Sequence, residues 1–198
     1  MDNNILFYVL ILFMFSISIK LYYDSDTFQL KCIVSDINGK KYCVRERTKI
    51  KEASNLLATT TEKLNKLVDH LHKKYPEKKS VVLLYNNYNP KKIKEILPTS
   101  EYTAYSENKG EKIAFCLSKV DKNDVDNLIE ENTLMFVALH EISHLATETI
   151  GHDDEFWNNF KFIIQEAKKI NVYQPIDYKK NKTQYCGTII KDNPYYDL

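Results

Sequence analysis

This 198-residue sequence lacks several features that would assign it to a common functional class. Its formal net charge is only +1, from 28 basic and 27 acidic residues, so we expect no nucleic-acid partner. Its four cysteines form no C-x-x-C pair, which argues against a cysteine-ligated zinc site. It contains no internal repeat and no low-complexity segment, and its length fits one globular core better than two.

What the sequence does contain is a cluster of histidines. Three of the five fall in one short window, where residues 140–144 read His-Glu-Ile-Ser-His and His152 follows. Residues four apart on a helix lie on the same face, so His140 and His144 can bind one zinc ion. Glu141, which lies between them, can take a proton from metal-bound water. The motif therefore indicates a zinc-dependent hydrolase.

The motif lies in a segment that we expect to form a buried helix. Residues 133–146 are apolar on nearly all sides and contain no glycine or proline. Asn132 or Thr133 could cap the start of this helix. Buried histidines and a buried glutamate need polar partners, and a metal ion supplies them. The plainer alternative is a pair of core histidines bonded to the backbone, with Glu141 at a surface edge.

The third zinc ligand has several candidates. We expect Gly151 to end the first helix and the acidic residues 153–155 to begin a second one, at the positive end of its dipole. His152 would then lie on the turn and could fold back over the first pair. Glu148 and Glu155 are the competing ligands, and we prefer His152 because neutral imidazole is the common partner in such sites. The other possibility is that His152 only caps a helix or faces solvent.

Two segments, residues 140–144 and 152–157, resemble the signature of WLM-type metalloproteases, which are related to SprT-like proteases. In that family an H-E-x-x-H helix is followed by H-x-x-x-F/W at the start of the next helix. Residues 108–117 are similar to the strand that such domains place before the active-site helix. The resemblance covers roughly residues 50–170. One departure is the interval between the second and third histidines, which is longer here.

The resemblance implies an α+β, zincin-like metallopeptidase domain with a small sheet and an H-E-x-x-H helix. It implies that His140, His144 and His152 bind Zn²⁺ and that Glu141 is the general base. We therefore predict a zinc metallopeptidase in which Glu141 assists the attack of zinc-bound water on a peptide bond of a protein or peptide substrate. The alternative is an inactive zincin-fold membrane protein with a binding or structural role. The whole chain also resembles uncharacterised small proteins of large DNA viruses, which identifies no substrate.

The N-terminal segment predicts a membrane partner. Residues 5–19 contain no charge and come close to the ~20 apolar residues that span a bilayer. We expect residues 1–25 to form a single transmembrane anchor. A cleaved signal peptide is the rival, disfavoured because residues 1–4 carry no Lys or Arg and no A-x-A site follows. Lys20 and Lys31 follow the segment, so the positive-inside rule favours a cytoplasmic domain.

Residues 26–50 are predicted to form a β-hairpin and linker, with strands at 28–34 and 41–44. A four-residue loop between the strands would place Cys32 opposite Cys43, whereas a tighter turn would misalign them. A disulfide between them would imply an oxidising compartment. Two reduced, packed thiols are equally compatible with the sequence.

Residues 51–172 are predicted to form the catalytic domain and residues 173–198 a surface tail. Within the former we expect helices over 51–75, 91–97 and 133–146, and strands at 81–85 and 113–117. Cys116 is expected in the core, whereas Cys186 has no explanation from the sequence. Asn181-Lys-Thr183 is a glycosylation sequon, which matters only if the domain faces a lumen.

Overall fold

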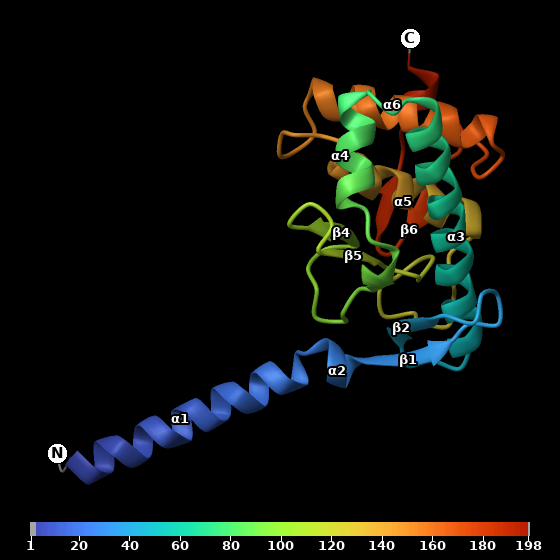
Figure 1. Ribbon diagram of the computed structural model, residues 1–198. Coiled ribbons are helices and arrows are strands. Elements are labelled where there is room, and N and C mark those ends of the chain that lie inside the picture. The colour runs from blue at the N-terminus through green and yellow to red at the C-terminus, as the bar shows by residue number, and fades with distance from the viewer. Residues whose placement is uncertain (1–2, 198) are drawn as a thin grey trace.

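The computed structural model describes residues 3–197, which form an α+β body with one helix projecting from it (Figure 1). That helix, α1 (Asn3–Tyr23), is apolar along its length and is not buried against the rest of the protein. Among the described residues it is the one helix long and apolar enough to cross a membrane, a property that a signal sequence shares. The short helix α2 (Asp26–Gln29) connects it to the folded body.

The predicted hairpin is present. Strands β1 (Leu30–Val34) and β2 (Lys41–Arg45) pair antiparallel around a four-residue loop, residues 36–39. This register places Cys32 directly opposite Cys43, and the two form a disulfide with Cα atoms 3.8 Å apart. Of the two alternatives, the structure therefore contains the disulfide and not the two reduced thiols.

Helix α3 (Ile50–Lys74) confirms the helix expected over 51–75. Its apolar residues recur at helical spacing, so one face is buried and the other carries charge. The buried apolar side chains of that face are Ala53, Leu57, Ala58, Leu64, Leu67, Val68 and Leu71.

Two predictions for the segment after α3 are wrong. Residues 81–85 were expected to form a strand, but they belong to helix α4 (Lys79–Asn87). Val81 and Leu84 are buried, three positions apart, which is helical spacing, and a short apolar run does not distinguish helix from strand. Residues 91–97 were expected to form a helix, but the chain makes a single 3₁₀ turn there and then a strand.

That strand, β3 (Ile93–Glu95), belongs to a three-stranded sheet with β4 (Ala104–Glu107) and β5 (Lys112–Phe115). The order is β3-β5-β4, with β3 parallel to β5 and β4 antiparallel to it. Strand β5 confirms the strand predicted over residues 113–117, although it ends two residues earlier than predicted. Strand β4 occupies one edge of the sheet, beside the helix that carries the histidines.

That helix is α5 (Glu131–Leu145), and α6 (Asp154–Lys169) follows it. The predicted helix over 133–146 and the predicted second helix are both confirmed. The predicted cap at Asn132 or Thr133 is wrong, because the helix begins earlier. Gly151 is also not the terminator: it has a φ of +103°, but α5 ends well before it.

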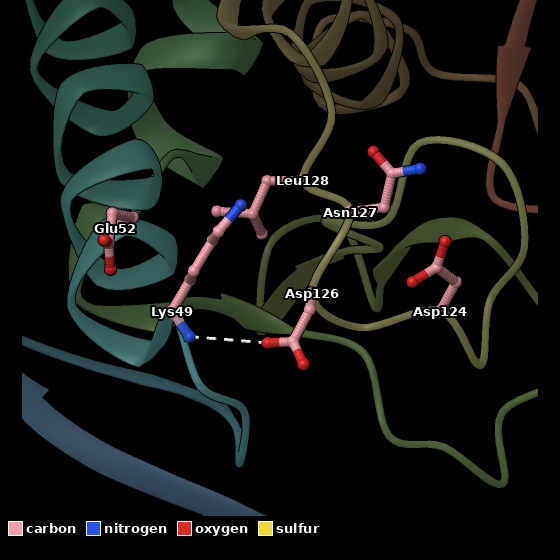
Figure 2. Close-up of a pocket in the computed structure, with 6 residues that line it drawn as sticks. All are labelled: Lys49, Glu52, Asp124, Asp126, Asn127 and Leu128. Atoms are coloured by element: carbon pink, nitrogen blue, oxygen red, sulfur yellow. Dashed lines mark hydrogen bonds between the residues drawn. The ribbon is translucent and has the colours of Figure 1, made fainter.

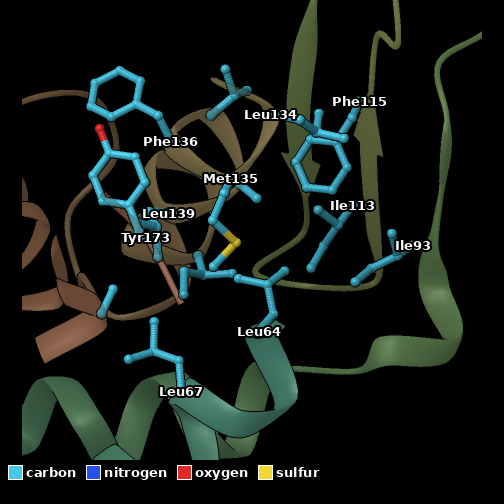
Figure 3. Packing of buried hydrophobic residues seen from close by; sticks show 14 of the residues in the cluster. Leu64, Leu67, Ile93, Ile113, Phe115, Leu134, Met135, Phe136, Leu139 and Tyr173 are labelled. Atoms are coloured by element: carbon cyan, nitrogen blue, oxygen red, sulfur yellow. The ribbon is translucent and has the colours of Figure 1, made fainter. Parts of the chain in front are cut away.

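The core is built around α5, which packs against α3, α6 and the sheet. Figure 3 shows Met135 of α5 at its centre, with Leu64 and Leu67 of α3 on one side and Ile113 and Phe115 of β5 on another. These side chains are all buried. Truncating one of them to alanine would cost about 2–5 kcal/mol of stability. The helix with the histidines is therefore held on several sides.

The C-terminal segment, which we predicted to be a surface tail, is largely exposed but has ordered elements and buried anchoring side chains. It forms a small hairpin, β6 (Thr183–Tyr185) and β7 (Thr188–Ile190). Tyr173, Tyr178 and Tyr185 are buried in the main core. Large aromatic side chains bury much apolar area, which explains why this segment packs inward.

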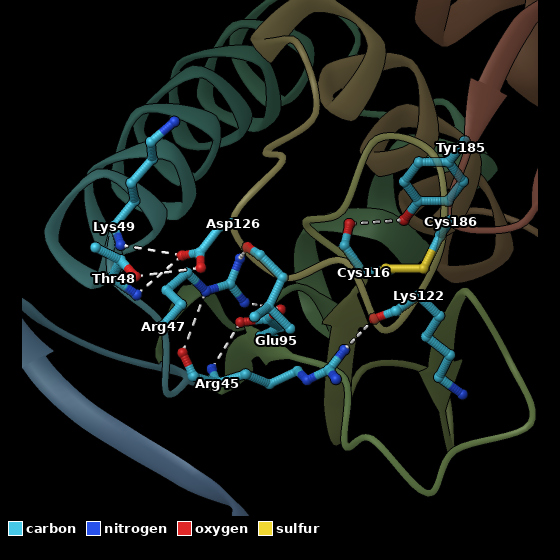
Figure 4. A network of polar contacts seen from close by, with 11 residues as sticks. Arg45, Arg47, Thr48, Lys49, Glu95, Cys116, Lys122, Asp126, Tyr185 and Cys186 are labelled. Carbon is cyan, nitrogen blue, oxygen red and sulfur yellow. Dashed lines mark hydrogen bonds and ion pairs between the residues drawn. A yellow bond between two sulfur atoms is a disulfide. The ribbon is translucent and has the colours of Figure 1, made fainter.

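A second disulfide anchors this segment. Cys116, just after β5, is bonded to Cys186 in the turn of the C-terminal hairpin, 70 positions away. The expectation that Cys116 lies in the core is confirmed, and Cys186 now has a partner. Beside the disulfide, the Tyr185 hydroxyl lies 3.1 Å from the carbonyl oxygen of Cys116 (Figure 4). It lies equally close, at 3.1 Å, to the carbonyl oxygen of Thr103.

A buried ion pair joins the N-terminal hairpin to the sheet (Figure 4). The Arg47 guanidinium contacts the Glu95 carboxylate, and neither side chain is exposed to solvent. The backbone N–H of Arg45 donates to the same carboxylate at 2.7 Å. Burial raises the pKa of Glu95, and the neighbouring Arg47 opposes that effect. The hairpin is therefore part of the folded body.

Candidate metal centre

The three predicted histidine ligands come together in space. His140 and His144 lie one turn apart on α5, and their Nε2 atoms are 3.3 Å apart. His152, on the connection between α5 and α6, places its Nε2 atom 3.0 Å from that of His140. One ligand atom from each of the three lies within 4.8 Å of the others.

This arrangement fits a tetrahedral metal ion. With Zn–N bonds of about 2.0–2.1 Å, tetrahedral geometry separates two ligand nitrogens by about 3.4 Å. The separations from His140 to His144 and to His152, 3.3 and 3.0 Å, are close to that value. Three imidazoles leave the fourth position of a tetrahedral ion for water or substrate. The three histidines could therefore hold a metal ion.

The competing ligands lie outside this cluster. The Glu148 carboxylate pairs with the Lys79 ammonium at 2.5 Å. Glu155 accepts hydrogen bonds from the backbone N–H of Glu148 and the hydroxyl of Thr149, each at 3.4 Å. Both acids stabilise the connection, and neither belongs to the group of potential ligands.

Specific hydrogen bonds shape the connection that carries His152. Asn159 of α6 donates from its side-chain amide to the Ala146 carbonyl oxygen and to the Thr147 hydroxyl, both at 3.1 Å. Lys109, on the turn between β4 and β5, donates to the carbonyl oxygens of Thr147 and Thr149 at 2.5 and 3.0 Å. The connection is thus fixed from two elements.

The start of α6 also positions His152. Asp153 caps the helix by accepting from the Phe156 N–H at 3.0 Å. The Phe156 ring then packs against all three imidazoles, with centroids 4.4 Å from His144, 4.6 Å from His152 and 4.9 Å from His140. The Trp157 ring lies 5.8 Å from His152. These contacts restrict the orientations of the imidazole rings.

Burial favours the neutral form of two of the imidazoles, those of His140 and His144. Burial lowers the pKa of His140 to about 3, and the neighbouring histidines add to the effect. Burial, followed by His152 and Lys109, lowers the pKa of His144 to about 4. Neutral imidazole is the form that binds a metal ion, so the lowered pKa values of His140 and His144 suit a role as metal ligands.

Glu141 is buried, with its side chain pointing into the same region. Burial raises the pKa of its carboxyl to about 8, although the polar groups of the neighbouring Ser106 act in the opposite direction. A carboxyl with a pKa near neutrality is suited to accept and release a proton. Ser106 lies on the edge strand β4, so this strand and α5 together form the site.

The site opens into a cavity of about 580 Å³. Its walls come from α5, from β4 and the turn that follows it, and from the connection before α6. Two apolar side chains at the cavity are strongly exposed: Ile150, at 97%, and Tyr102, at 65%. The full lining is Tyr102, Ala104, Tyr105, Ser106, Asn108, Lys109, His140, Glu141, His144, Thr149, Ile150, Gly151 and His152.

A second open depression, of about 600 Å³, lies elsewhere and is lined mainly by polar side chains (Figure 2). It lies between the start of α3 and residues 124–128. Asp126 there accepts from the backbone N–H groups of Thr48 and Lys49, so its carboxylate is engaged in holding the chain. It shares no residue with the histidine cavity.

Sequence reasoning missed Ser106 and Lys109. Neither lies in a recognisable motif, and both reach the site only because β4 packs beside α5. It also missed Tyr185, whose hydroxyl contacts the backbone just before β4 from a segment that we expected on the surface. Tertiary structure alone reveals these three roles.

The sequence was also compared with known proteins. It is 30% identical over 165 residues, 81% of the chain, to uncharacterized protein R325 of Acanthamoeba polyphaga mimivirus, of which it covers 82%. The chain belongs to the same family as this viral protein. It is also 31% identical over 74 residues, 37% of the chain, to uncharacterized protein 136R of Invertebrate iridescent virus 6, of which it covers 40%.

No model of a known protein family matches the chain. No solved structure gives a significant match either. Because both viral proteins are uncharacterized, the similarity to them indicates no activity. A functional assignment must therefore rest on the site itself.

Proposed function

We propose that this chain is a membrane-anchored, zinc-dependent metallopeptidase with a zincin-like fold, akin to the WLM-type and SprT-like proteases. The observation that supports it best is the convergence of His140, His144 and His152 beside the buried carboxyl of Glu141. A structural zinc site would not need that glutamate. The alternative is an inactive zincin-fold protein that uses the same site for binding.

The three imidazoles would hold the zinc ion, which when bound supplies a Lewis acid that polarises a carbonyl and activates water. Glu141 would serve as the general base and then as the donor of the proton to the leaving amine. Ser106, which lines the same cavity, would favour the charged form of the Glu141 carboxyl. Phe156, packed on all three imidazoles, would limit access of water from that side.

The geometry favours an extended peptide as substrate. Strand β4 is an edge strand, and Ala104, Tyr105 and Ser106 line the same cavity as His140 and Glu141. An edge strand can accept an extended peptide through backbone hydrogen bonds. A peptide added there would run past the Glu141 carboxyl, where a general base is required.

The apolar helix α1 supports a membrane anchor. Its large apolar side chains face outward, with none buried in the folded body, which suits contact with lipid. Tyr22 and Tyr23 lie at its end, where aromatic residues favour the membrane interface. A protein or peptide substrate near a membrane is the partner that this arrangement favours, and the balanced charge favours no nucleic acid.

Zinc stoichiometry tests the metal site. The full chain, purified in detergent and loaded with zinc, should hold one zinc ion, and His152→Ala should lose it or bind it much more weakly. His72→Ala, which removes a half-buried histidine outside the cluster, is the matched control and should bind zinc normally. One zinc unaffected by His152→Ala would transfer the role of third ligand to another residue. No zinc in the wild-type chain would refute the proposal.

Glu141→Gln separates the peptidase from the binding protein. The substitution keeps the shape and removes the base, so zinc should be retained while cleavage of unfolded protein substrates falls by at least about 100-fold. A wild-type chain that binds zinc but cleaves none of a varied set of unfolded substrates would favour the binding role. Equal activity in both forms would exclude Glu141 as the base.

A further inference from the structure

The cysteines of this chain carry information about its compartment. The sequence contains four cysteines, and all four are paired, Cys32 with Cys43 and Cys116 with Cys186. The first pair joins two neighbouring strands, and the second joins the sheet to the C-terminal hairpin. Disulfides persist in oxidising compartments and are rare where glutathione keeps thiols reduced. Two independent disulfides therefore favour an oxidising compartment.

The helix α1 supplies a means of reaching such a compartment. It precedes all four cysteines in the sequence, and it is long and apolar enough to insert in a membrane. Whether it is an anchor or a cleaved signal, it can direct the residues that follow it across the membrane. By the positive-inside rule, the lysines at positions 20 and 31 favour a cytoplasmic domain, but that rule describes only a bias in membrane insertion. The disulfides, by contrast, need the oxidising side to persist.

The sequence has one Asn-x-Ser/Thr sequon, at Asn181. Asn181 is exposed, and its Nδ2 atom makes one long hydrogen bond, 3.4 Å, to the carbonyl oxygen of Asp177. Thr183, the residue that completes the sequon, donates its hydroxyl to the Asn181 carbonyl oxygen at 3.2 Å. The side-chain amide is thus accessible, and no residue of the turn that bears it lines the histidine cavity.

We propose that the folded part of the chain lies on the oxidising side of the membrane and that Asn181 carries an N-linked oligosaccharide there. The donor class is a lipid-linked oligosaccharide diphosphate. The Asn181 Nδ2 atom would form a bond to the anomeric carbon of the first sugar and lose a proton, while the bond from that carbon to the lipid diphosphate breaks. This proposal does not depend on the peptidase activity.

The test is expression of the full chain in eukaryotic cells, followed by digestion with a peptide-N-glycosidase. The wild-type chain should shift to higher mobility on digestion, and Asn181→Gln and Thr183→Ala should migrate at the digested position without treatment. Thr183→Ser preserves the sequon and should keep the shift. Asn123→Gln, an exposed asparagine outside any sequon, is the matched control.

Two further measurements on the same cells keep the proposal falsifiable even if a variant misfolds. The folded part should resist protease added to the cytosolic side of sealed membranes, and thiol labelling should detect no free cysteine before reduction and four after it. Digestion by the cytosolic protease, with or without disulfides, would overturn the proposed orientation. A protected chain without glycan would overturn the proposed modification of Asn181.

Discussion

Lys109 and Thr147 join the edge of the sheet to the end of the helix that bears the metal site. The Lys109 ammonium donates to the Thr147 carbonyl oxygen at 2.5 Å and also reaches the Thr149 carbonyl oxygen. These carbonyls lie just beyond the C-terminal end of α5, where a cation is favoured by the helix dipole. Lys109 therefore fixes the path of the chain towards His152.

We expect Lys109→Met to weaken zinc binding by about tenfold, because removing a residue that positions a ligand typically costs 10- to 100-fold and Lys109 acts through the backbone. Competition with a chromophoric chelator would measure the change in affinity. Lys91→Met, at an exposed lysine away from the site, is the control. Unchanged affinity in a folded Lys109→Met chain would show that Asn159 alone is enough to hold the connection.

The buried Arg47–Glu95 pair should be essential for stability. Replacing Glu95 with glutamine leaves the Arg47 charge buried without its counter-ion, and such changes cost about 3–5 kcal/mol. Urea denaturation should report this loss in the free energy of unfolding. Glu46→Gln removes the exposed partner of Lys31 and should cost less than about 1 kcal/mol. Similar losses in the two variants would contradict the assigned role.

Glu166 should make the protein sensitive to acid. Its burial raises the pKa of the carboxyl, but hydrogen bonds from four side chains outweigh this and bring the pKa to about 2, below the ordinary value of 4.5. The donors are Lys169, His70, Lys74 and Tyr75. Because the pKa is lower in the folded state than in the unfolded state, the ionised carboxylate stabilises the folded state above pH 4.5. This contribution to the free energy of unfolding is lost as the pH falls towards 2.

The full contribution is on the order of 3 kcal/mol, since each pKa unit corresponds to about 1.4 kcal/mol. Urea midpoints measured at pH 7, 4.5 and 3 should therefore fall less steeply in Glu166→Gln than in the wild-type chain. Glu77→Gln, at an exposed glutamate, should follow the wild-type curve. Parallel curves for all three proteins would exclude Glu166 as the acid-sensitive group.

The two disulfides should contribute unequally. A disulfide stabilises by restricting the unfolded chain, and the restriction grows with the length of the loop it closes. The loops span 70 and 11 positions, which corresponds to about 4 and 3 kcal/mol. Paired Cys→Ser variants at 116/186 and at 32/43 would measure these losses by urea denaturation. A larger loss from the shorter loop would show that native packing, rather than loop closure, dominates.

Local patterns in the sequence predicted the parts of the fold that are locally determined. The spacing within α5 and α6 indicated both helices, and a four-residue loop was enough to align Cys32 with Cys43. The spacing of apolar residues did not predict α4, because a nine-residue segment with a short apolar run is equally compatible with a strand. The helix forms there because it buries Val81 and Leu84 against the core.

The candidate site was predictable to the extent that it follows one motif. His140, Glu141 and His144 are neighbours in the sequence, and His152 is close enough to be considered. Ser106 and Lys109 reach them through the pairing of β4 with β5 and its packing on α5, which no local pattern specifies. The Cys116–Cys186 bond was equally hidden, because its partners are 70 positions apart.

That bond has a practical consequence for work with the protein. Residues 117–185, which include α5 and α6, lie between its two cysteines. A single backbone cut anywhere in that stretch leaves both products covalently attached, so a nicked molecule keeps its mass and migrates close to the intact one until the sulfurs are reduced. Gels run without reductant would therefore conceal cleavage within the very region that carries the histidines.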